Sequence, residues 1–306
     1  SRSAMFSGRF GFSNGVVSHY GRRAEPYLES VDRTVRYSPA TSTAWPALMR
    51  DSGMMTATVS PFAARHSLYT FLAGFRESFD PGGFGHGDGA EVTRLASQWL
   101  DRHGRSDNWF LHVNFWDPHI PYRLPEWLKP DWPPELPDSW LTEERFRQYV
   151  TRPGHRSFLD TFALRNIKEE PPYQPGRVAT MEDYQAMINS YDLAIRYTDV
   201  QVGSLFDRLA ELGILEETAI IVAADHGEDM GEMGSIGHGL ASRHTAQVPM
   251  IVRWPGVTDS QAGATVGELC YHFDIAATVL DLLEVPRPEI WDGRSLAGSL
   301  EGEDGG

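Results

Sequence analysis

The sequence predicts an α/β fold, built on a doubly wound, mostly parallel central sheet with helices on both faces. Short apolar runs bounded by turn or polar residues indicate strands buried on both faces. These runs are Thr56–Val59, Trp109–Phe115, Ala219–Ala224 and Pro249–Trp254. Helical patterns lie between them, and such alternation is typical of a parallel sheet.

Three amphipathic patterns predict the helices. Apolar side chains recur at helical spacing over Ala90–Arg102 and over a longer stretch, Met181–Leu212. Gly213 supplies a stop signal at the end of the long helix. A third helix is expected over Phe273–Leu283, closed by Pro286.

The segment 121–175 differs from the rest of the chain. It holds ten of the twenty prolines of the chain. Three tryptophans, Trp127, Trp132 and Trp140, lie between these prolines. We interpret it as a stiff excursion from one domain that spans residues 1–300, rather than as a second domain. A packed surface loop and a substrate-facing lid both fit this composition. Residues 301–306 are expected to form a short tail.

Bulk composition excludes some classes of partner. The net charge of −15 argues against nucleic acid, because phosphate binding needs a basic surface. An anionic substrate remains compatible with it, since a metal and a few cations can reverse the local field. The chain has no run of eighteen apolar residues, so no membrane partner is expected. The single cysteine, Cys270, excludes an internal disulfide. Compartment and oligomeric state stay open.

Two potential metal ligands follow the third predicted strand. Asp225-His226-Gly227 comes directly after it, and parallel sheets bind ligands at the carboxyl ends of their strands. Asp225 and His226 offer a hard oxygen and an imidazole nitrogen to one cation. Gly227 is expected to let the backbone turn sharply away. Such a pair is usually structural or solvated, but the strand end and the following Gly-rich stretch favour a metal site.

A second polar segment follows the second predicted strand. Asp117-Pro118-His119 is expected at the same edge of the sheet, where Pro118 restrains Asp117 and His119 can face a substrate. The alternative is a turn capped by Asp117 with an exposed histidine.

Two further histidines lie in similar settings. Gly237-His238-Gly239 places an imidazole between glycines, where backbone and ring can approach an anion. Arg65-His66 follows the first predicted strand after a turn that contains proline. Either could be an ordinary surface or packing histidine. A functional site is favoured because His, Asp and Arg residues follow several of the predicted strands, whose carboxyl ends meet at the same edge of the sheet.

Several segments resemble, in order, those of sulfatases of the alkaline phosphatase superfamily. Ser1–Arg9 resembles the end of the family's Cys/Ser-x-Pro-Ser-Arg signature and the helix after it. The most specific stretch is Thr218–Gly256, with IIVAADHGE, a Gly-rich loop and VPMIVRWPG. The other matching segments are Leu111–Tyr122, Tyr191–Gly203, Asp274–Leu283 and Asp292–Leu296. The resemblance therefore covers nearly the whole chain and implies the alkaline phosphatase/sulfatase-like fold.

The resemblance implies an enzyme that hydrolyses the sulfate monoester of a small molecule or a saccharide. It implies a formylglycine nucleophile and one divalent metal, in the first place Ca²⁺, with Mn²⁺ or another transition metal as the alternative. Asp225 and His226 match the family's second pair of metal ligands.

Four residues receive catalytic roles from the same resemblance. Arg2 matches the signature arginine that steadies the nucleophile. His119 matches the histidine that binds sulfate and can protonate the leaving alcohol. His238 falls where many sulfatases have a lysine on the sulfate, which is a departure from the family. His66 falls near the family's Lys-x-His position, although the lysine is missing.

The resemblance also implies that part of the site lies upstream of Ser1. The nucleophile, derived from Cys or Ser, is expected three residues before Ser1, and a pair of metal-binding aspartates further upstream. We therefore expect an N-terminally truncated chain that lacks its first strand and is inactive by itself.

Two other functions remain open. A phosphodiester or phosphonate monoester hydrolase of the same superfamily has similar motifs, and a two-metal version would use Asp117 as an extra ligand. A non-catalytic scaffold with the same fold would explain the missing nucleophile.

Overall fold

The computed structural model describes residues 2–16, 43–83, 87–122, 124–128, 140–154, 156–161 and 174–302. The chain packs as two compact units. Unit 1 comprises Ser1–Trp116, Ser204–Asp225 and Ile251–Gly306, and unit 2 comprises Asp117–Gly203 and His226–Met250. The expectation of one domain over residues 1–300 stays a prediction, because such packing does not show whether either unit folds alone.

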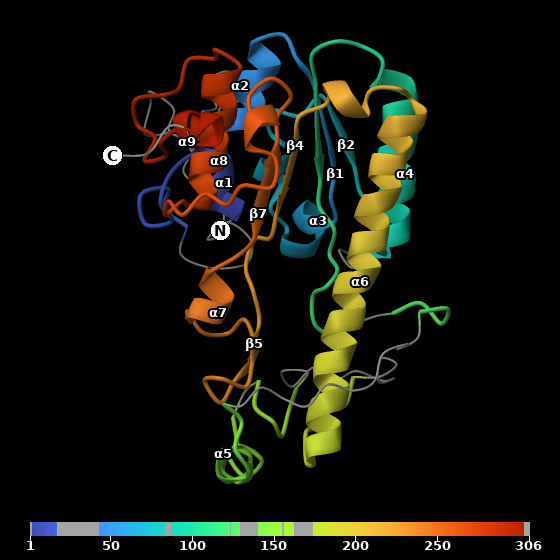
Figure 1. Ribbon diagram of the computed structural model, residues 1–306, viewed down its shortest axis with the longest axis vertical. Coiled ribbons are helices and arrows are strands. Elements are labelled where there is room, and N and C mark those ends of the chain that lie inside the picture. The colour runs from blue at the N-terminus through green and yellow to red at the C-terminus, as the bar shows by residue number, and fades with distance from the viewer. Residues whose placement is uncertain are drawn as a thin grey trace. The chain divides into compact units, whose positions relative to one another are not determined.

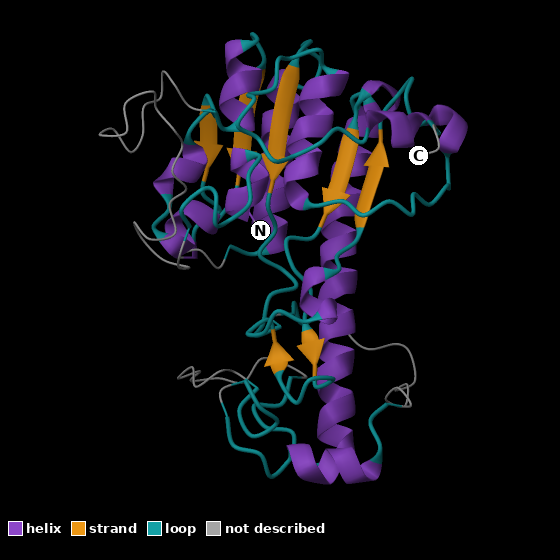
Figure 2. Cartoon of the chain, turned by 90° about the vertical axis from the view of Figure 1, so that its left-hand side faces the viewer, coloured by secondary structure: helices purple, strands orange, loops and turns teal. Residues whose placement is uncertain are grey.

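Unit 1 contains five strands among its described residues, in two sheets (Figures 1 and 2). They are β1 (Met55–Val59), β2 (Glu77–Phe79), β3 (Trp109–Val113), β4 (Ile220–Ala223) and β7 (Met250–Arg253). Its helices are α1 (Arg2–Ser7), α2 (Trp45–Asp51), α3 (Phe62–His66), α4 (Gly89–His103), α8 (His272–Leu282) and α9 (Ala297–Glu301). Single 3-10 turns cover Tyr69–Leu72, Leu215–Glu217 and Asp259–Gln261.

The three-stranded sheet has the order β2-β1-β3, and both pairings are parallel. Side chains of β1 alternate between its two faces, as the geometry of a strand requires. Ala57 and Val59 belong to the apolar clusters shared with α4 and the end of α6. Thr58 faces the other way and bonds to His112 on β3. Helices therefore cover the sheet, as the α/β pattern predicts.

The second sheet of unit 1 pairs β4 with β7, side by side in Figure 1. Its strands are less covered than those of the first sheet. Val222 on β4 is 37% exposed and Ile251 on β7 is 64% exposed. The expectation that all four strands are buried on both faces is therefore wrong for this pair. The physical reason is that no third described strand flanks either one, so fewer neighbours cover their side chains.

Unit 2 is built around the first part of the long helix α6 (Met181–Glu211), which ends in unit 1. Its other elements are α5 (Glu143–Tyr149), α7 (Arg243–Ala246) and the antiparallel strands β5 (Asp229–Met230) and β6 (Ile236–Gly237). Apolar side chains from the loops and from α6 form one core, in which Tyr122, Phe158 and Met187 are fully buried.

The described parts of the excursion at 121–175 belong to this core. Trp140 packs against it, whereas Trp127 is 61% exposed. Trp132 lies outside the described residues, as do residues 303–306 of the expected tail. Among the residues that the structure describes, no helix combines the length and the apolar character needed to cross a membrane.

Long, strongly patterned elements follow the sequence prediction closely. The four predicted strands correspond to β1, β3, β4 and β7, and the three predicted helices to α4, α6 and α8, each within one or two residues at its ends. The pattern did not predict β2, the β5–β6 hairpin or the helices of seven residues or fewer. Such short elements carry too few residues for a period to show.

Gly8, directly after α1, requires glycine for two separate reasons. Its φ is +65°, and a Cβ there would lie 2.1 Å from the Trp291 ring. We predict that Gly8→Ala lowers the free energy of unfolding by about 3 kcal/mol, because left-handed strain adds to a clash with a buried ring.

The matched control is Gly213→Ala. Gly213 has φ +76°, and no other group lies within 4 Å of the place that a Cβ would occupy, so only backbone strain of about 1–2 kcal/mol applies. Urea titrations followed by tryptophan fluorescence measure both variants. Equal losses in the two would contradict the clash with Trp291.

Candidate active site

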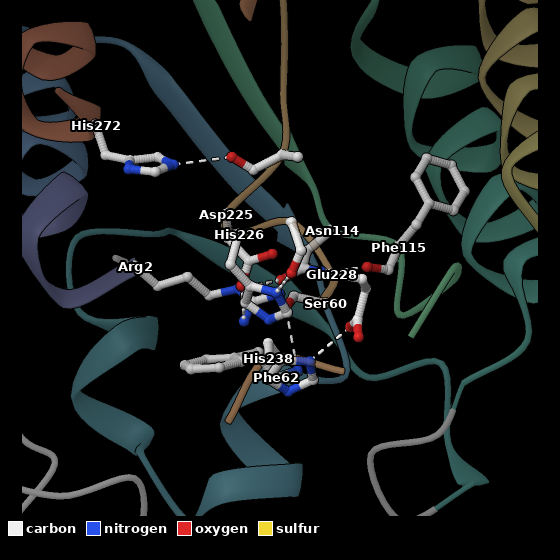
Figure 3. A network of polar contacts seen from close by, with 12 residues as sticks. Arg2, Ser60, Phe62, Asn114, Phe115, Asp225, His226, Glu228, His238 and His272 are labelled. Atoms are coloured by element: carbon white, nitrogen blue, oxygen red, sulfur yellow. Dashed lines mark hydrogen bonds and ion pairs between the residues drawn. The ribbon is translucent and has the colours of Figure 1, made fainter. Parts of the chain in front are cut away.

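Arg2 joins the start of α1 to the carboxyl ends of two strands. Its Nη1 lies 2.6 Å from Oδ2 of Asp225, the second residue after β4. Its Nε donates to Oδ1 of Asn114, directly after β3, at 3.1 Å. The guanidinium carbon lies 4.3 Å from the centroid of the Phe62 ring. Figure 3 shows Arg2 reaching toward the Asp225 carboxylate. The structure therefore brings two of the predicted site residues, Arg2 and Asp225, into direct contact.

Burial and charge act in opposite directions on Arg2. Burial lowers the pKa of its guanidinium from the ordinary value, and the negative charge of Asp225 offsets part of that effect. Both side chains are largely covered, with 19% of Arg2 and 25% of Asp225 exposed. Covering both charges costs desolvation energy, so removing one partner leaves the other buried and uncompensated.

Two further contacts fix this part of unit 1. His272 at the start of α8 bonds through Nε2 to the carbonyl oxygen of Ala224 at 2.8 Å, which holds the backbone just before Asp225 (Figure 3). His66 at the end of α3 lies against the Phe62 ring, with centroids 4.5 Å apart, and near Trp116 at 6.0 Å. The imidazole of His66 thus takes part in aromatic packing beside the ring that Arg2 covers.

His112 is a partly buried histidine that the sequence reasoning missed. It lies on β3, where Nδ1 bonds to Oγ1 of Thr58 at 2.9 Å and the ring packs against Phe6 and Phe75. Burial, with a smaller contribution from the Arg2 charge, lowers the pKa of His112 from 6.5 to about 4. His112 is therefore neutral at physiological pH.

Three imidazoles come together in unit 2. The ring of His238 lies 4.0 Å from that of His226 and 4.9 Å from that of His119, centroid to centroid. Nδ1 of His238 bonds to Oε1 of Glu228 at 2.6 Å, as Figure 3 shows. His119 bonds through Nδ1 to the carbonyl oxygen of Ile120. The expected convergence of His119, His226 and His238 is therefore present within this unit.

The tautomer of His226 suits metal binding. Its Nδ1 lies 3.0 Å from the carbonyl oxygen of Gly227. A carbonyl oxygen only accepts, so Nδ1 carries the hydrogen and Nε2 carries the lone pair that a metal needs.

Gly227 is required for close approach rather than for an unusual backbone angle. A Cβ at this position would lie 2.0 Å from the carbonyl oxygen of His244. The N–H of Gly227 donates to the carbonyl oxygen of Thr245 at 2.9 Å. Its φ lies outside the left-handed region, so the approach to His244 is what requires glycine here. The expected sharp turn at Gly227 stays a prediction.

The side chains around His226 fit a divalent cation. One ligand atom from each of His226, Glu228 and His238 lies within 4.8 Å of the other two. Only 5% of the Glu228 side chain is exposed, and its buried Oε2 has no hydrogen-bond partner among the described residues. A cation compensates such an oxygen. Two imidazoles and one carboxylate suit a transition metal better than Ca²⁺, which takes oxygen ligands.

The family model named Sulfatase matches residues 1–285, which is most of the chain. This chain belongs to the sulfatase family. The match includes both Arg2 and the Asp225-His226 pair, so the resemblance of the separate segments reflects one continuous relationship.

The sulfatase chain is similar to curated proteins with sulfatase names. It is 31% identical to human iduronate 2-sulfatase over 204 residues, which are 62% of this chain and 35% of that protein. It spans less than half the length of the curated relatives it matches.

Solved structures of the same fold cover almost all of this sulfatase chain. A phosphonate monoester hydrolase of Agrobacterium radiobacter superimposes with a TM-score of 0.72 at 22% identity, covering 99% of this chain and 67% of that one. A 2-O GAG sulfatase gives a TM-score of 0.71 at 20% identity, covering 99% and 64%. At these identities the likeness shows the fold, which confirms the predicted alkaline phosphatase/sulfatase-like architecture.

Two residues of the candidate site escaped the sequence reasoning. Asn114 is the first residue after β3, but the sequence prediction extended this strand to Phe115, so Asn114 was counted inside the strand and not at its end. Glu228 comes directly after Asp225-His226-Gly227, but nothing in the sequence indicated that its carboxylate turns back to His238. Asp117, proposed as a ligand in a two-metal site, belongs to neither cluster of metal-type ligands among the described residues.

The low pKa of His112 predicts a pH-dependent stability. Below pH 6.5 the unfolded chain binds a proton at this histidine, while the folded chain does not until about pH 4. Stability is therefore full above pH 6.5 and falls as the pH drops toward 4, by up to about 3 kcal/mol.

The measurement compares wild type with His112→Asn by urea titration at pH 7.5 and at pH 4.5. Other groups titrate in both proteins, so the difference between the two pH dependences isolates His112. Wild type should lose more stability on acidification than the variant. Equal losses would show that His112 does not stay neutral in the folded protein.

Proposed function

We propose that the protein to which this chain belongs hydrolyses sulfate monoesters. The observation that supports this most is the contact of His238 with both His226 and His119, the last of which lies more than a hundred residues earlier in the sequence. Membership of the sulfatase family supports it as well. The similarity to human iduronate 2-sulfatase points to a sulfated saccharide as the substrate class.

Each side chain has a task that its surroundings support. A bond forms between sulfur and the oxygen of the nucleophile proposed upstream of Ser1. The substrate's S–O bond to the alcohol breaks, and the electron pair of that bond stays with the departing oxygen. His119 donates a proton to that oxygen, so the product leaves as a neutral alcohol. His238 and Arg2 donate N–H groups to the sulfate oxygens, where negative charge grows. His226 and Asp225 serve as metal ligands.

A divalent cation bound there would polarise the sulfate oxygens and lower the pKa of the attacking oxygen. The imidazole nitrogen of His226 favours Mn²⁺ or another transition metal over the Ca²⁺ expected from the family resemblance. We assign Glu228 a positioning role and not a catalytic one. Its Oε1 accepts the Nδ1 hydrogen of His238 and so orients the His238 ring. The formylglycine nucleophile and the two further aspartates are proposed to lie upstream of Ser1. His66 is proposed to support the site through Phe62.

The proposal predicts that His238→Ala lowers kcat strongly in a protein that includes the sequence upstream of Ser1. Loss of one charge-stabilising donor raises the barrier by about 3 kcal/mol, roughly a hundredfold in rate. Hydrolysis of an aryl sulfate by purified protein measures this. His103→Ala, which removes a histidine of α4 in unit 1, is the control and should retain wild-type turnover.

The same assay separates the two ester classes. Sulfatase activity predicts a higher kcat/KM for the aryl sulfate than for an aryl phosphonate monoester. A preference for the phosphonate would support the alternative hydrolase. Turnover of neither ester by a protein shown to carry the aldehyde nucleophile would favour the scaffold.

A further inference from the structure

Unit 2 contains a second cluster of side chains that could bind a metal. It shares no residue with the cluster of His226, Glu228 and His238. It consists of Asp229 on β5, Glu232 in the turn after it, and His244 on α7. One ligand atom from each lies within 4.8 Å of the other two. Neither the sequence motifs nor the proposed sulfate chemistry uses these residues.

Asp229 is the unusual member of the cluster. It is fully buried, with 0% of its side chain exposed. Its Oδ1 accepts a hydrogen bond from Oγ of Ser242 at 2.7 Å. Its Oδ2 is also buried and has no hydrogen-bond partner among the described residues. A carboxylate held away from water with one oxygen unpaired is costly, and buried carboxylates are normally paired or bound to a metal.

His244 does not satisfy this carboxylate by itself. Its Nδ1 lies 3.4 Å from Oδ1 of Asp229, which is long for a hydrogen bond, and it approaches the oxygen that Ser242 already occupies. The ring is 44% exposed, so it can turn toward a cation at little cost. The contact therefore places a nitrogen ligand beside the buried oxygen without neutralising it.

Backbone contacts hold the cluster in place. Oε2 of Glu232 accepts the N–H of Met230 at 2.7 Å, which orients this carboxylate in the turn. The side chain of Ser242 caps α7 by accepting the N–H of Thr245. The three ligands thus stand on elements that are fixed by other bonds, as a metal site requires.

We propose that Asp229, Glu232 and His244 bind a divalent transition-metal cation such as Zn²⁺ or Mn²⁺. Two carboxylates and one imidazole suit these ions, and the cation would compensate Oδ2 of Asp229. Its role is structural, because it links β5 and the following turn to α7. It would stabilise the segment 226–246, which also contains His238.

The test measures Zn²⁺ binding by isothermal titration calorimetry to a chain of residues 1–306, after treatment with a chelator. The starting protein is His226→Ala/His238→Ala, which removes the other cluster's imidazoles. It should bind one Zn²⁺, and adding His244→Ala should weaken this binding at least tenfold. His244 is exposed, so its loss should leave the circular dichroism spectrum unchanged.

Arg243→Ala is the matched control, since it removes a neighbouring side chain of α7 that bonds to Gln247 and is not a ligand. It should bind Zn²⁺ like the starting protein. Asp229→Asn provides a second test and should also weaken binding. Equal Zn²⁺ affinity with and without His244, or no Zn²⁺ binding by the starting protein, would overturn the proposal.

Discussion

The ion pair between Arg2 and Asp225 is the interaction on which the arrangement of unit 1 depends most. It connects the first helix of the chain to the carboxyl end of β4, and Asn114 adds the end of β3 to the same contact. These three elements are far apart in the sequence. The pair is mostly shielded from water, so neither charge is stable there without the other. The side-chain direction of Asp225 is fixed as a result.

The fixed position of Asp225 matters because the next residue, His226, is the first residue of unit 2 in this segment and a member of its first cluster of candidate metal ligands. His226 follows it directly, with its tautomer set by the Gly227 carbonyl oxygen. Close approach of Gly227 to α7 then leaves no room for a side chain. The Asp-His-Gly motif therefore combines three physical requirements: a paired carboxylate, an oriented imidazole and a backbone without a Cβ.

The sequence predicted the main fold because apolar periodicity is strong in long elements. Helices α4, α6 and α8 and strands β1, β3, β4 and β7 all follow from it. The β5–β6 hairpin did not, because two-residue strands in a Gly-rich stretch have no readable period.

The site was partly predictable, because strand ends can be located from the sequence whereas the path of a loop cannot. Strand ends indicated Asp225 and His119, but the return of Glu228 to His238 depends on how the loop folds over ten residues. The partly buried His112 could not be distinguished in the sequence from any other strand residue.

The most direct test of this account is a double-mutant cycle on Arg2 and Asp225. The free energy of unfolding is measured by urea titration for wild type, Arg2→Gln, Asp225→Asn and the double variant, all with a chelator present. Each single change leaves a buried charge uncompensated, so the account predicts a coupling energy of about 2 kcal/mol. A coupling energy below about 0.5 kcal/mol, the level of an exposed surface pair, would contradict it.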